Sequence, residues 1–321
     1  MQRTYAALDL GTNNCRLLIA RPQGDGFVVV DAFSRIVRLG EGLAASGRLS
    51  DAAMDRAVAA LAICADKLKR RHVTLVRSVA TEACRRAVNG TEFIARVAAE
   101  TGIRLEIISA EQEARLAVVG CHALLEPGTG QALVFDIGGG STELVLLAGG
   151  DAALADVEDW FSAPWGVVSL SESVPHEGAD AAQLYEAYGR MRATAAQAFA
   201  PFAARLRDRG ARPGRLLGTS GTVTTLASLH LDLPAYDRKR IDGLIVPSSD
   251  MRGASQRLAG MTVAERAALR CIGTERADLV VAGCAILEAI LDVWPAERLA
   301  VADRGIREGI LRGLMAGDHA Q

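Results

Sequence analysis

The strongest candidate for chemistry in this sequence is a glycine-rich stretch, residues 136–143, which reads Asp-Ile-Gly-Gly-Gly-Ser-Thr-Glu. Its three consecutive glycines, Gly138, Gly139 and Gly140, let the backbone approach a ligand closely. Successive N–H groups in such a turn can point at one anion, which suits a phosphate group. A tight hairpin that merely needs glycines is the alternative explanation for the glycines alone.

The polar residues around these glycines favour a functional loop over a simple hairpin. Ser141 and Thr142 add hydroxyl donors for a phosphate, and Asp136 and Glu143 bracket the loop with carboxylates. Carboxylate oxygens are the ligands that Mg²⁺ prefers when it also holds substrate phosphates. The stretch therefore predicts a phosphate site with a magnesium ion beside it.

The same pattern occurs a second time, near the start of the chain. Residues 8–20 and 135–148 each read as a short apolar strand, an Asp, a turn of small residues and a second apolar strand. Placing Asp9 on Asp136 makes Asp9 a further candidate metal ligand. Two such hairpins, about one domain length apart, indicate two homologous halves. The candidate phosphate-binding residues of the first copy are Gly11, Thr12, Asn13 and Asn14.

A third loop of small residues, 218–222, lies between a predicted strand and a predicted helix. The N–H groups at a helix N-terminus form a natural anion site, which makes Ser220, Gly221 and Thr222 candidate phosphate ligands. On its own, this loop is equally compatible with an ordinary strand-to-helix turn.

Charged residues follow two further predicted strands. Glu111 and Glu113 open a helix, where a carboxylate is commonly only a partner of the helix dipole. Arg85 and Arg86 follow another strand end and are either phosphate clamps or part of a solvated helix face. Residues 238–240, Arg-Lys-Arg, favour surface charge.

Composition excludes several classes of function. The chain has 321 residues, 36 basic and 38 acidic, with a net charge of −2, which argues against general adhesion to nucleic acid or to an anionic membrane. The histidines show no metal-ligand spacing, and no signal peptide or apolar run of about 18 residues is present. We therefore expect a cytoplasmic protein. The six scattered cysteines are expected to be reduced and mostly buried: Cys15, Cys64, Cys84, Cys121, Cys271 and Cys284.

The elements that must position these loops follow an α/β pattern. Ser50 can cap a helix that extends to about Arg71, and Gly102 can end a helix over 91–100. Strands are expected over 28–30, 36–39, 73–80, 103–108, 215–217 and 299–301, around the hairpin 131–148. Further helices are expected over 111–125, 180–209, 222–230, 249–258, 276–293 and 305–316. Residues 127–130, Pro-Gly-Thr-Gly, are the best domain boundary. This predicts one domain of residues 1–126 plus the C-terminal helix 304–321, and a second of residues 127–303.

With these motifs in order, the sequence resembles the exopolyphosphatase and guanosine pentaphosphate phosphatase family over nearly its whole length. The segments that carry the resemblance are 5–14, 81–89, 108–116, 136–143, 218–222, 275–278 and 303–309. The resemblance implies the actin-like ATPase fold, two ribonuclease-H-like domains that flank a cleft. It also implies Mg²⁺-dependent release of the terminal phosphate of polyphosphate, or of the 5′ γ-phosphate of guanosine pentaphosphate.

The resemblance also assigns roles to residues that the sequence alone leaves open. Glu113 matches the family's catalytic glutamate and would orient and deprotonate the attacking water, while Gln112 stands where the family usually has another glutamate. Arg85 and the glycine loops would neutralise charge on the transferred phosphate. Glu111 is expected to be a bystander. A homodimer is expected, with K⁺ as a candidate second cation.

Some features depart from the family pattern. The first loop reads Gly-Thr-Asn-Asn rather than Gly-Ser-Asn-Ser, Ala110 replaces a glycine, and Ser169 stands at a common arginine position. The chain ends after about two domains, which favours short polyphosphates or nucleotides over processive degradation of long chains. Two alternatives are an actin-fold phosphotransferase that uses ATP, and a regulator that binds guanosine tetraphosphate with little catalysis.

Overall fold

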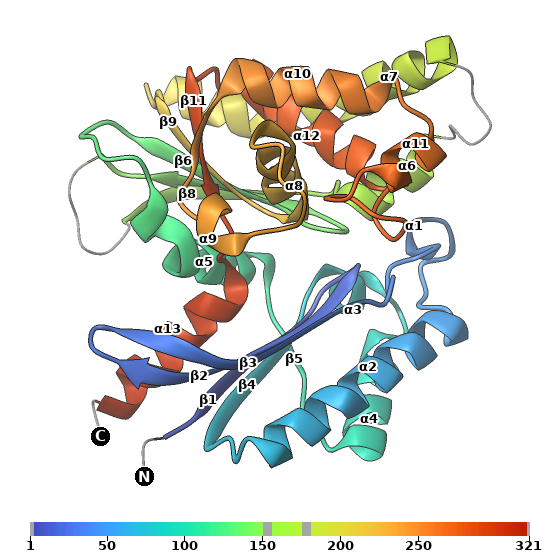
Figure 1. Cartoon of the computed structure of the whole chain (residues 1–321), viewed down its shortest axis with the longest axis vertical. Coiled ribbons are helices and arrows are strands. Elements are labelled where there is room, and N and C mark those ends of the chain that lie inside the picture. Colours follow the sequence, from blue (N-terminus) through green and yellow to red (C-terminus); the bar gives the residue numbers. More distant parts are fainter. Residues whose placement is uncertain (1–2, 150–155, 175–180, 320–321) are drawn as a thin grey trace. The chain divides into compact units, whose positions relative to one another are not determined.

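The computed structural model describes residues 3–149, 156–174 and 181–319 (Figure 1). The chain forms two compact units. Unit 1 comprises Met1–Gly120 with Gly305–Gln321, and unit 2 comprises Cys121–Arg304. Each unit is built around one β-sheet.

The sheet of unit 1 has five strands in the order β3-β2-β1-β4-β5. β2 pairs antiparallel with both β1 and β3, whereas β4 runs parallel to β1 and β5 runs parallel to β4. This is the ribonuclease-H-like arrangement. The strands are β1 (Tyr5–Leu10), β2 (Asn14–Gln23), β3 (Gly26–Ile36), β4 (Leu75–Ala80) and β5 (Glu106–Ile107).

The central strand β1 is buried on both faces, and its alternate residues belong to two different apolar layers. Ala6, Leu8 and Leu10 pack in a core with α2 and α4. Tyr5 and Ala7 pack in a second core with α5 and with α13, the C-terminal helix. The helices of unit 1 are α1 (Leu43–Ser46), α2 (Asp51–Arg70), α3 (Glu82–Arg86), α4 (Gly90–Thr101), α5 (Ala110–Cys121) and α13 (Ile306–His319).

The sheet of unit 2 repeats this arrangement. Its order is β10-β11-β9-β6-β7-β8, in which β6 takes the place of β1 and β10 is an added edge strand. β7 pairs antiparallel with β6 and β8, while β9 and β11 continue the sheet in parallel. The strands are β6 (Ala132–Ile137), β7 (Thr142–Leu147), β8 (Val157–Ala163), β9 (Arg215–Thr219), β10 (Ile245–Pro247) and β11 (Arg298–Ala302). The duplication seen in two short hairpins therefore extends to whole sheets, and the predicted fold class is confirmed.

The core of unit 2 is centred on α12, whose residues 280–291 are all buried. This helix packs mainly against the long helix α7. The helices of this unit are the 3₁₀ turn η1 (His122–Leu124), α6 (Val167–Ser173), α7 (Ala181–Asp208), α8 (Gly221–His230), α9 (Arg238–Ile241), α10 (Ser248–Ala259), α11 (Val263–Ala268) and α12 (Val280–Val293).

The structure confirms the predicted helix caps and the reduced cysteines. The Ser50 side chain caps α2 by accepting a hydrogen bond from the Ala53 N–H. Gly102 ends α4 in the left-handed conformation, with φ 73°. All six cysteines are free thiols, and only Cys271 is not fully buried.

Other expectations were wrong. Residues 37–39 do not form a strand, because the N–H groups of Val37 and Arg38 bond the Asn13 carbonyl in the first loop. The strand expected over 103–108 pairs only at Glu106–Ile107, and α12 begins at Val280 rather than near residue 276. β8 and β10 were not anticipated. The expected start of the long helix at residue 180 lies outside the described residues.

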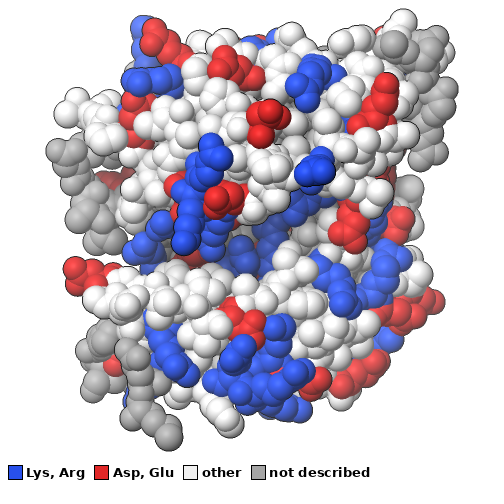
Figure 2. Space-filling model, in the orientation of Figure 1, with Lys and Arg blue, Asp and Glu red and all other residues white. Residues whose placement is uncertain are grey.

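The described helices include none that combines the length and the apolar character needed to cross a membrane. On the face shown in Figure 2, basic and acidic side chains are interspersed on both units. This mixture agrees with the net charge of −2.

Candidate functional site

In each unit, the predicted loops follow the carboxyl ends of neighbouring strands. In unit 1, Leu10 of β1 lies beside Ala80 of β4, which lies beside Ile107 of β5. The segments that follow these strands therefore begin at one edge of the sheet, where ligands bind in open α/β folds. In unit 2, the ends of β6, β9 and β11 are arranged in the same way. Each unit thus has its own group of loops at one edge of its sheet.

The first loop, residues 11–14, is held by backbone hydrogen bonds. The Gly11 N–H donates to the Asn14 carbonyl (2.9 Å), closing the turn. The segment after β3 then crosses the loop, because Val37 and Gly40 donate to the carbonyls of Asn13 and Thr12. The side chains of Thr12 and Asn13 are buried as a result.

Asp9 lies directly before this loop and is buried. Neither Asp9 Oδ1 nor Asn13 Oδ1 receives a hydrogen bond from any described residue. Burial raises the pKa of Asp9, and the charges of Arg16 and Arg307 offset part of this rise. Two buried oxygens without donors are what a cation or a water molecule would satisfy.

Arg16 is a residue that the motif reading missed. It lies opposite Asp9 across the β1–β2 ladder, just as Glu143 lies opposite Asp136 in the β6–β7 ladder. The alignment of the two hairpins contained this signal, because it places Arg16 on Glu143. The two copies therefore differ in charge at one matched position, positive in unit 1 and negative in unit 2.

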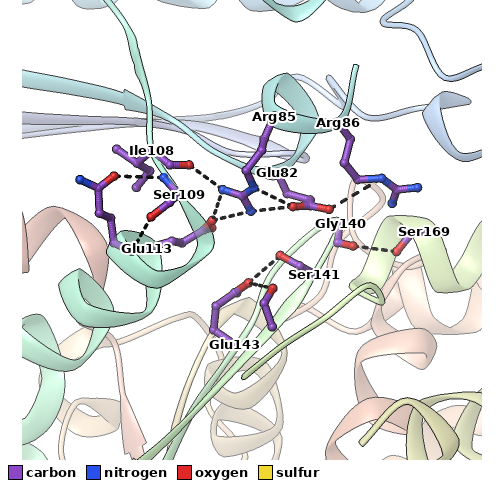
Figure 3. Close-up of polar contacts among 12 residues, drawn as sticks. Glu82, Arg85, Arg86, Ile108, Ser109, Glu113, Gly140, Ser141, Glu143 and Ser169 are labelled. Atoms are coloured by element: carbon purple, nitrogen blue, oxygen red, sulfur yellow. Dashed lines mark hydrogen bonds and ion pairs between the residues drawn. The ribbon is translucent and has the colours of Figure 1, made fainter. Parts of the chain in front are cut away.

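Arg85 on α3 joins two carboxylates (Figure 3). Its guanidinium donates to Glu113 Oε2 on α5 (3.1 and 3.2 Å) and to Glu82 Oε2 on its own helix (2.5 and 3.1 Å). It also donates to the Ile108 carbonyl (2.7 Å). Burial lowers the pKa of Arg85, but the charges of Glu113 and Glu82 outweigh this and raise it. Glu113 is itself buried, so the structure brings two predicted site residues, Arg85 and Glu113, into direct contact.

The beginning of α5 explains why Gln112 replaces a glutamate without loss of structure. Gln112 Oε1 accepts from the Ser109 N–H, and Ser109 Oγ accepts from the Gln112 N–H. This reciprocal pair is a capping box, a role that Gln fills as well as Glu. Gln112 thus caps the helix, while the next residue, Glu113, turns toward Arg85.

The second loop, residues 138–141, closes with the same hydrogen bond as the first. The Gly138 N–H donates to the Ser141 carbonyl (3.0 Å), as Gly11 does to Asn14. Glu143 Oε1 accepts from two hydroxyls, those of Ser141 (2.7 Å) and Ser162 (2.9 Å). Asp136 stands at the end of β6, directly across the ladder from Glu143. The predicted bracket of two carboxylates therefore exists in unit 2.

A segment that begins α6 supports the glycines of this loop. The N–H groups of Val167 and Val168 donate to the carbonyls of Gly138 and Gly139 (2.9 and 2.8 Å). Ser169 Oγ donates to the Gly140 carbonyl (3.1 Å), as Figure 3 shows. At this common arginine position, the serine is therefore buried and bonded to the loop backbone.

Thr142 has a structural partner. Its hydroxyl donates to the Trp165 carbonyl (2.7 Å), and the side chain is fully buried. Its hydroxyl is therefore engaged inside unit 2.

The third loop leads into α8. Ser220 is its N-cap, and its side chain accepts from the Val223 N–H. The Thr222 side chain packs against Gly283 of α12, where an added Cβ would lie 2.0 Å from Thr222 Oγ1. Gly221 is the first residue of the helix. The preceding Thr219 hydroxyl donates to the Arg304 carbonyl, which links this loop to the segment after β11.

The basic stretch 238–240 is not wholly solvated. Arg238 pairs with the Asp303 carboxylate (3.2 Å) and donates to the Asp303 carbonyl (2.7 Å). Arg304 pairs with Asp242 (2.6 Å). These contacts fix the segment after β11 within unit 2.

The described residues contain no cluster of three or more His, Cys, Asp or Glu that would hold a metal ion by itself. Mg²⁺ commonly uses one or two carboxylates and completes its shell with water and substrate phosphates. In unit 1 the side-chain oxygens of Asp9 and Asn13, and in unit 2 the carboxylates of Asp136 and Glu143, are each of the ligand type that such an ion prefers.

Comparison with known proteins identifies the family of this chain. The model of the Ppx/GppA phosphatase family matches residues 18–317. Exopolyphosphatase 2 of Mycobacterium tuberculosis is 35% identical over 96% of this chain and 98% of its own length. A putative exopolyphosphatase of Haemophilus influenzae is 31% identical over 97% of this chain and 91% of its own.

Solved structures agree. The Ppx/GppA family member of Aquifex aeolicus is 28% identical, with a TM-score of 0.79 over 99% of both chains. An exopolyphosphatase of Cytophaga hutchinsonii is 25% identical, with a TM-score of 0.86 over 98% of both. The matched fold is that of the actin-like ATPases. From its sequence and its fold, this chain belongs to the Ppx/GppA phosphatase family.

Proposed function

We propose that this protein is a Mg²⁺-dependent exopolyphosphatase that releases the terminal phosphate of inorganic polyphosphate, and that guanosine pentaphosphate is a second substrate. The observation that carries the proposal is the Glu113 carboxylate, buried at the beginning of α5 and held by Arg85. A positioned carboxylate can act as the general base that takes a proton from an attacking water molecule.

In the reaction, a water molecule attacks the terminal phosphorus in line with the bridging oxygen. Glu113 accepts the proton of this water as the new P–O bond forms. The P–O bond to the rest of the chain breaks, and orthophosphate leaves together with a polyphosphate shorter by one unit. N–H groups of the glycine loops stabilise the negative charge on the transferred phosphoryl oxygens.

The magnesium part of the proposal rests on Asp9 and on the Asp136–Glu143 pair. The buried Oδ1 atoms of Asp9 and Asn13, without donors among the described residues, fit a cation or its bound water. The two hydroxyls on Glu143 Oε1 fix the direction of that carboxylate. When bound, Mg²⁺ would neutralise substrate oxygens and stabilise the leaving group. A potassium ion is a second candidate, tested by replacing K⁺ with Na⁺ in the assay.

The deciding experiment measures phosphate release from medium-chain polyphosphate and from guanosine pentaphosphate, with Mg²⁺ and with a chelator. The Glu113→Gln variant should lower kcat at least about 100-fold, because it removes the base and keeps the shape. The matched control is Glu111→Gln. It removes a neighbouring charge whose one ion pair among the described residues is with exposed Arg115, and it should leave kcat unchanged.

Three outcomes would overturn the proposal. If Glu113→Gln retains full activity, Glu113 is not the base. If neither substrate yields phosphate while guanosine tetraphosphate still binds, the protein is a regulator and not a hydrolase. Phosphate transfer that requires ATP and an acceptor would indicate a phosphotransferase instead. The expected homodimer and cytoplasmic location remain predictions, and light scattering of the purified protein tests the first.

A further inference from the structure

The guanidinium of Arg85 has no unused donor. An arginine side chain offers five N–H groups. Nε donates to Glu82, Nη2 donates to Glu82 and Glu113, and Nη1 donates to Glu113 and the Ile108 carbonyl. Five donors therefore meet five acceptor contacts. A phosphate oxygen can bond Arg85 only if one of these acceptors gives up its place.

The three acceptors differ in how easily they can leave. The Ile108 carbonyl belongs to the backbone between β5 and α5, so it cannot move alone. Glu113 is fixed on α5, and its side chain is only 9% exposed. Glu82 has a second cation beside it, because Arg86 Nε lies 3.8 Å from Glu82 Oε1 (Figure 3). Glu82 could therefore release Arg85 and still keep a partner for its charge.

The local charge supports the same conclusion. The formal charges of this group sum to zero, because it contains two glutamates (Glu82 and Glu113) and two arginines (Arg85 and Arg86). In the free protein the group therefore does not attract a polyanion. The side chains of Arg85 and Glu82 are 22% and 13% exposed, so an incoming anion can reach their contact. Exchange of the Glu82 carboxylate for a phosphate would keep the charge on Arg85 matched throughout.

We propose that Glu82 is a placeholder for substrate. Its carboxylate occupies the Nε–Nη2 edge of Arg85 in the free protein, and a phosphate group of the substrate displaces it toward Arg86. Glu82 thereby weakens binding of phosphate and prevents Arg85 from retaining the product. This inference rests on the proposed function, because it takes Arg85 to be a phosphate ligand.

The test measures the Kd of inorganic phosphate by calorimetry, which needs no turnover. The proteins compared are the native chain, Glu82→Gln, Arg85→Ala and the double variant. Glu82→Gln keeps the side-chain shape and should tighten phosphate binding about threefold or more, the range that one ion pair supplies. In the Arg85→Ala background, the same change should have no effect, because the contact is already absent.

Steady-state kinetics on polyphosphate provide the second readout. Glu82→Gln should lower KM by a similar factor, with kcat within about twofold of the native value. Glu111→Gln is the control for simple loss of a negative charge and should leave KM unchanged.

An unchanged or weaker phosphate affinity in Glu82→Gln would overturn the inference. So would a tightening that persists without Arg85, since it would show a general charge effect. The two proposals fail separately. A protein that binds phosphate in the predicted pattern but releases none from any substrate disproves the hydrolase and leaves the placeholder supported.

Discussion

At the scale of single residues, the carboxylates beside the loops of unit 1 and unit 2 differ in the hydrogen bonds that they accept. Glu143 is oriented by two serine hydroxyls, whereas Asp9 Oδ1 meets no donor among the described residues. An oriented carboxylate keeps its geometry when a ligand is absent. A carboxylate without donors depends on a ligand or water for compensation.

Ser162 tests the importance of this orientation. Ser162→Ala removes one of the two hydroxyls on Glu143 and should raise the Mg²⁺ concentration for half-maximal phosphate release about tenfold, as loss of an outer-shell partner typically does. The measurement is a Mg²⁺ titration of activity. Ser173→Ala is the control, because the one bond of its hydroxyl among the described residues is to the Leu170 carbonyl of its own helix. An equal Mg²⁺ requirement in both variants would show that the Ser162 hydroxyl does not prepare Glu143 for a metal.

The sequence predicted part of this site and left part of it open. The two loops were evident because the Asp-x-Gly pattern occurs twice in the sequence. Both loops close with the same hydrogen bond. The contact of Arg85 with Glu113 could not be read from the sequence, because it depends on how α3 and α5 follow neighbouring strands. Gln112 looked like a lost acidic residue until the structure showed its capping role.

At the scale of elements, the glycine loop of unit 2 depends on the helix behind it. The first residues of α6 bond three successive glycine carbonyls, and Gly166 lies against them. A Cβ on Gly166 would lie 2.4 Å from the Gly139 carbonyl carbon, which real structures do not tolerate. The close packing of α6 against the loop therefore depends on the glycine at position 166.

Gly166→Ala should thus impair activity more than folding. We expect kcat/KM for polyphosphate to fall at least about tenfold, since displacement of oriented donors is costly. The control is Gly253→Ala in α10, where an added Cβ meets nothing within 4 Å. That variant should keep its activity and gain about 0.5–1 kcal/mol in free energy of unfolding. Native activity in Gly166→Ala would refute the supporting role of α6.

Strand order was harder to predict than strand existence. The hairpin loops indicated two related halves, but the shared central order of both sheets follows from long-range pairing that no local pattern encodes. The segment after β3 looked like a strand because of its apolar residues. In the structure its N–H groups donate hydrogen bonds to carbonyls of the first loop instead.

At the scale of the whole molecule, unit 1 is assembled from both ends of the chain. Helix α13 covers one face of the sheet through Ile310 and Leu311, which pack against Tyr5, Ala7 and Leu18. The Tyr5 hydroxyl and Arg3 also contact Asp318 near the C-terminus. A substitution in the last helix should therefore destabilise the first strands.

Leu311→Ala tests this dependence. Leu311 is fully buried, and its truncation should cost about 2–5 kcal/mol in free energy of unfolding, measured by urea denaturation. Gly317→Ala, on the same helix with nothing near the added methyl group, is the control and should not destabilise. An equal, small effect in both would show that α13 contributes little to unit 1.

The position of α13 has a consequence for synthesis of the protein. Unit 2 is one continuous segment, Cys121–Arg304, and all of it is synthesised before the final helix. One face of the N-terminal sheet, which contains Tyr5 and Ala7, therefore stays without its covering helix until α13 has been synthesised. A chain released before residue 306 would contain every residue of unit 2 but lack the helix that completes unit 1. The first residues to be translated would then be among the last to reach their native packing.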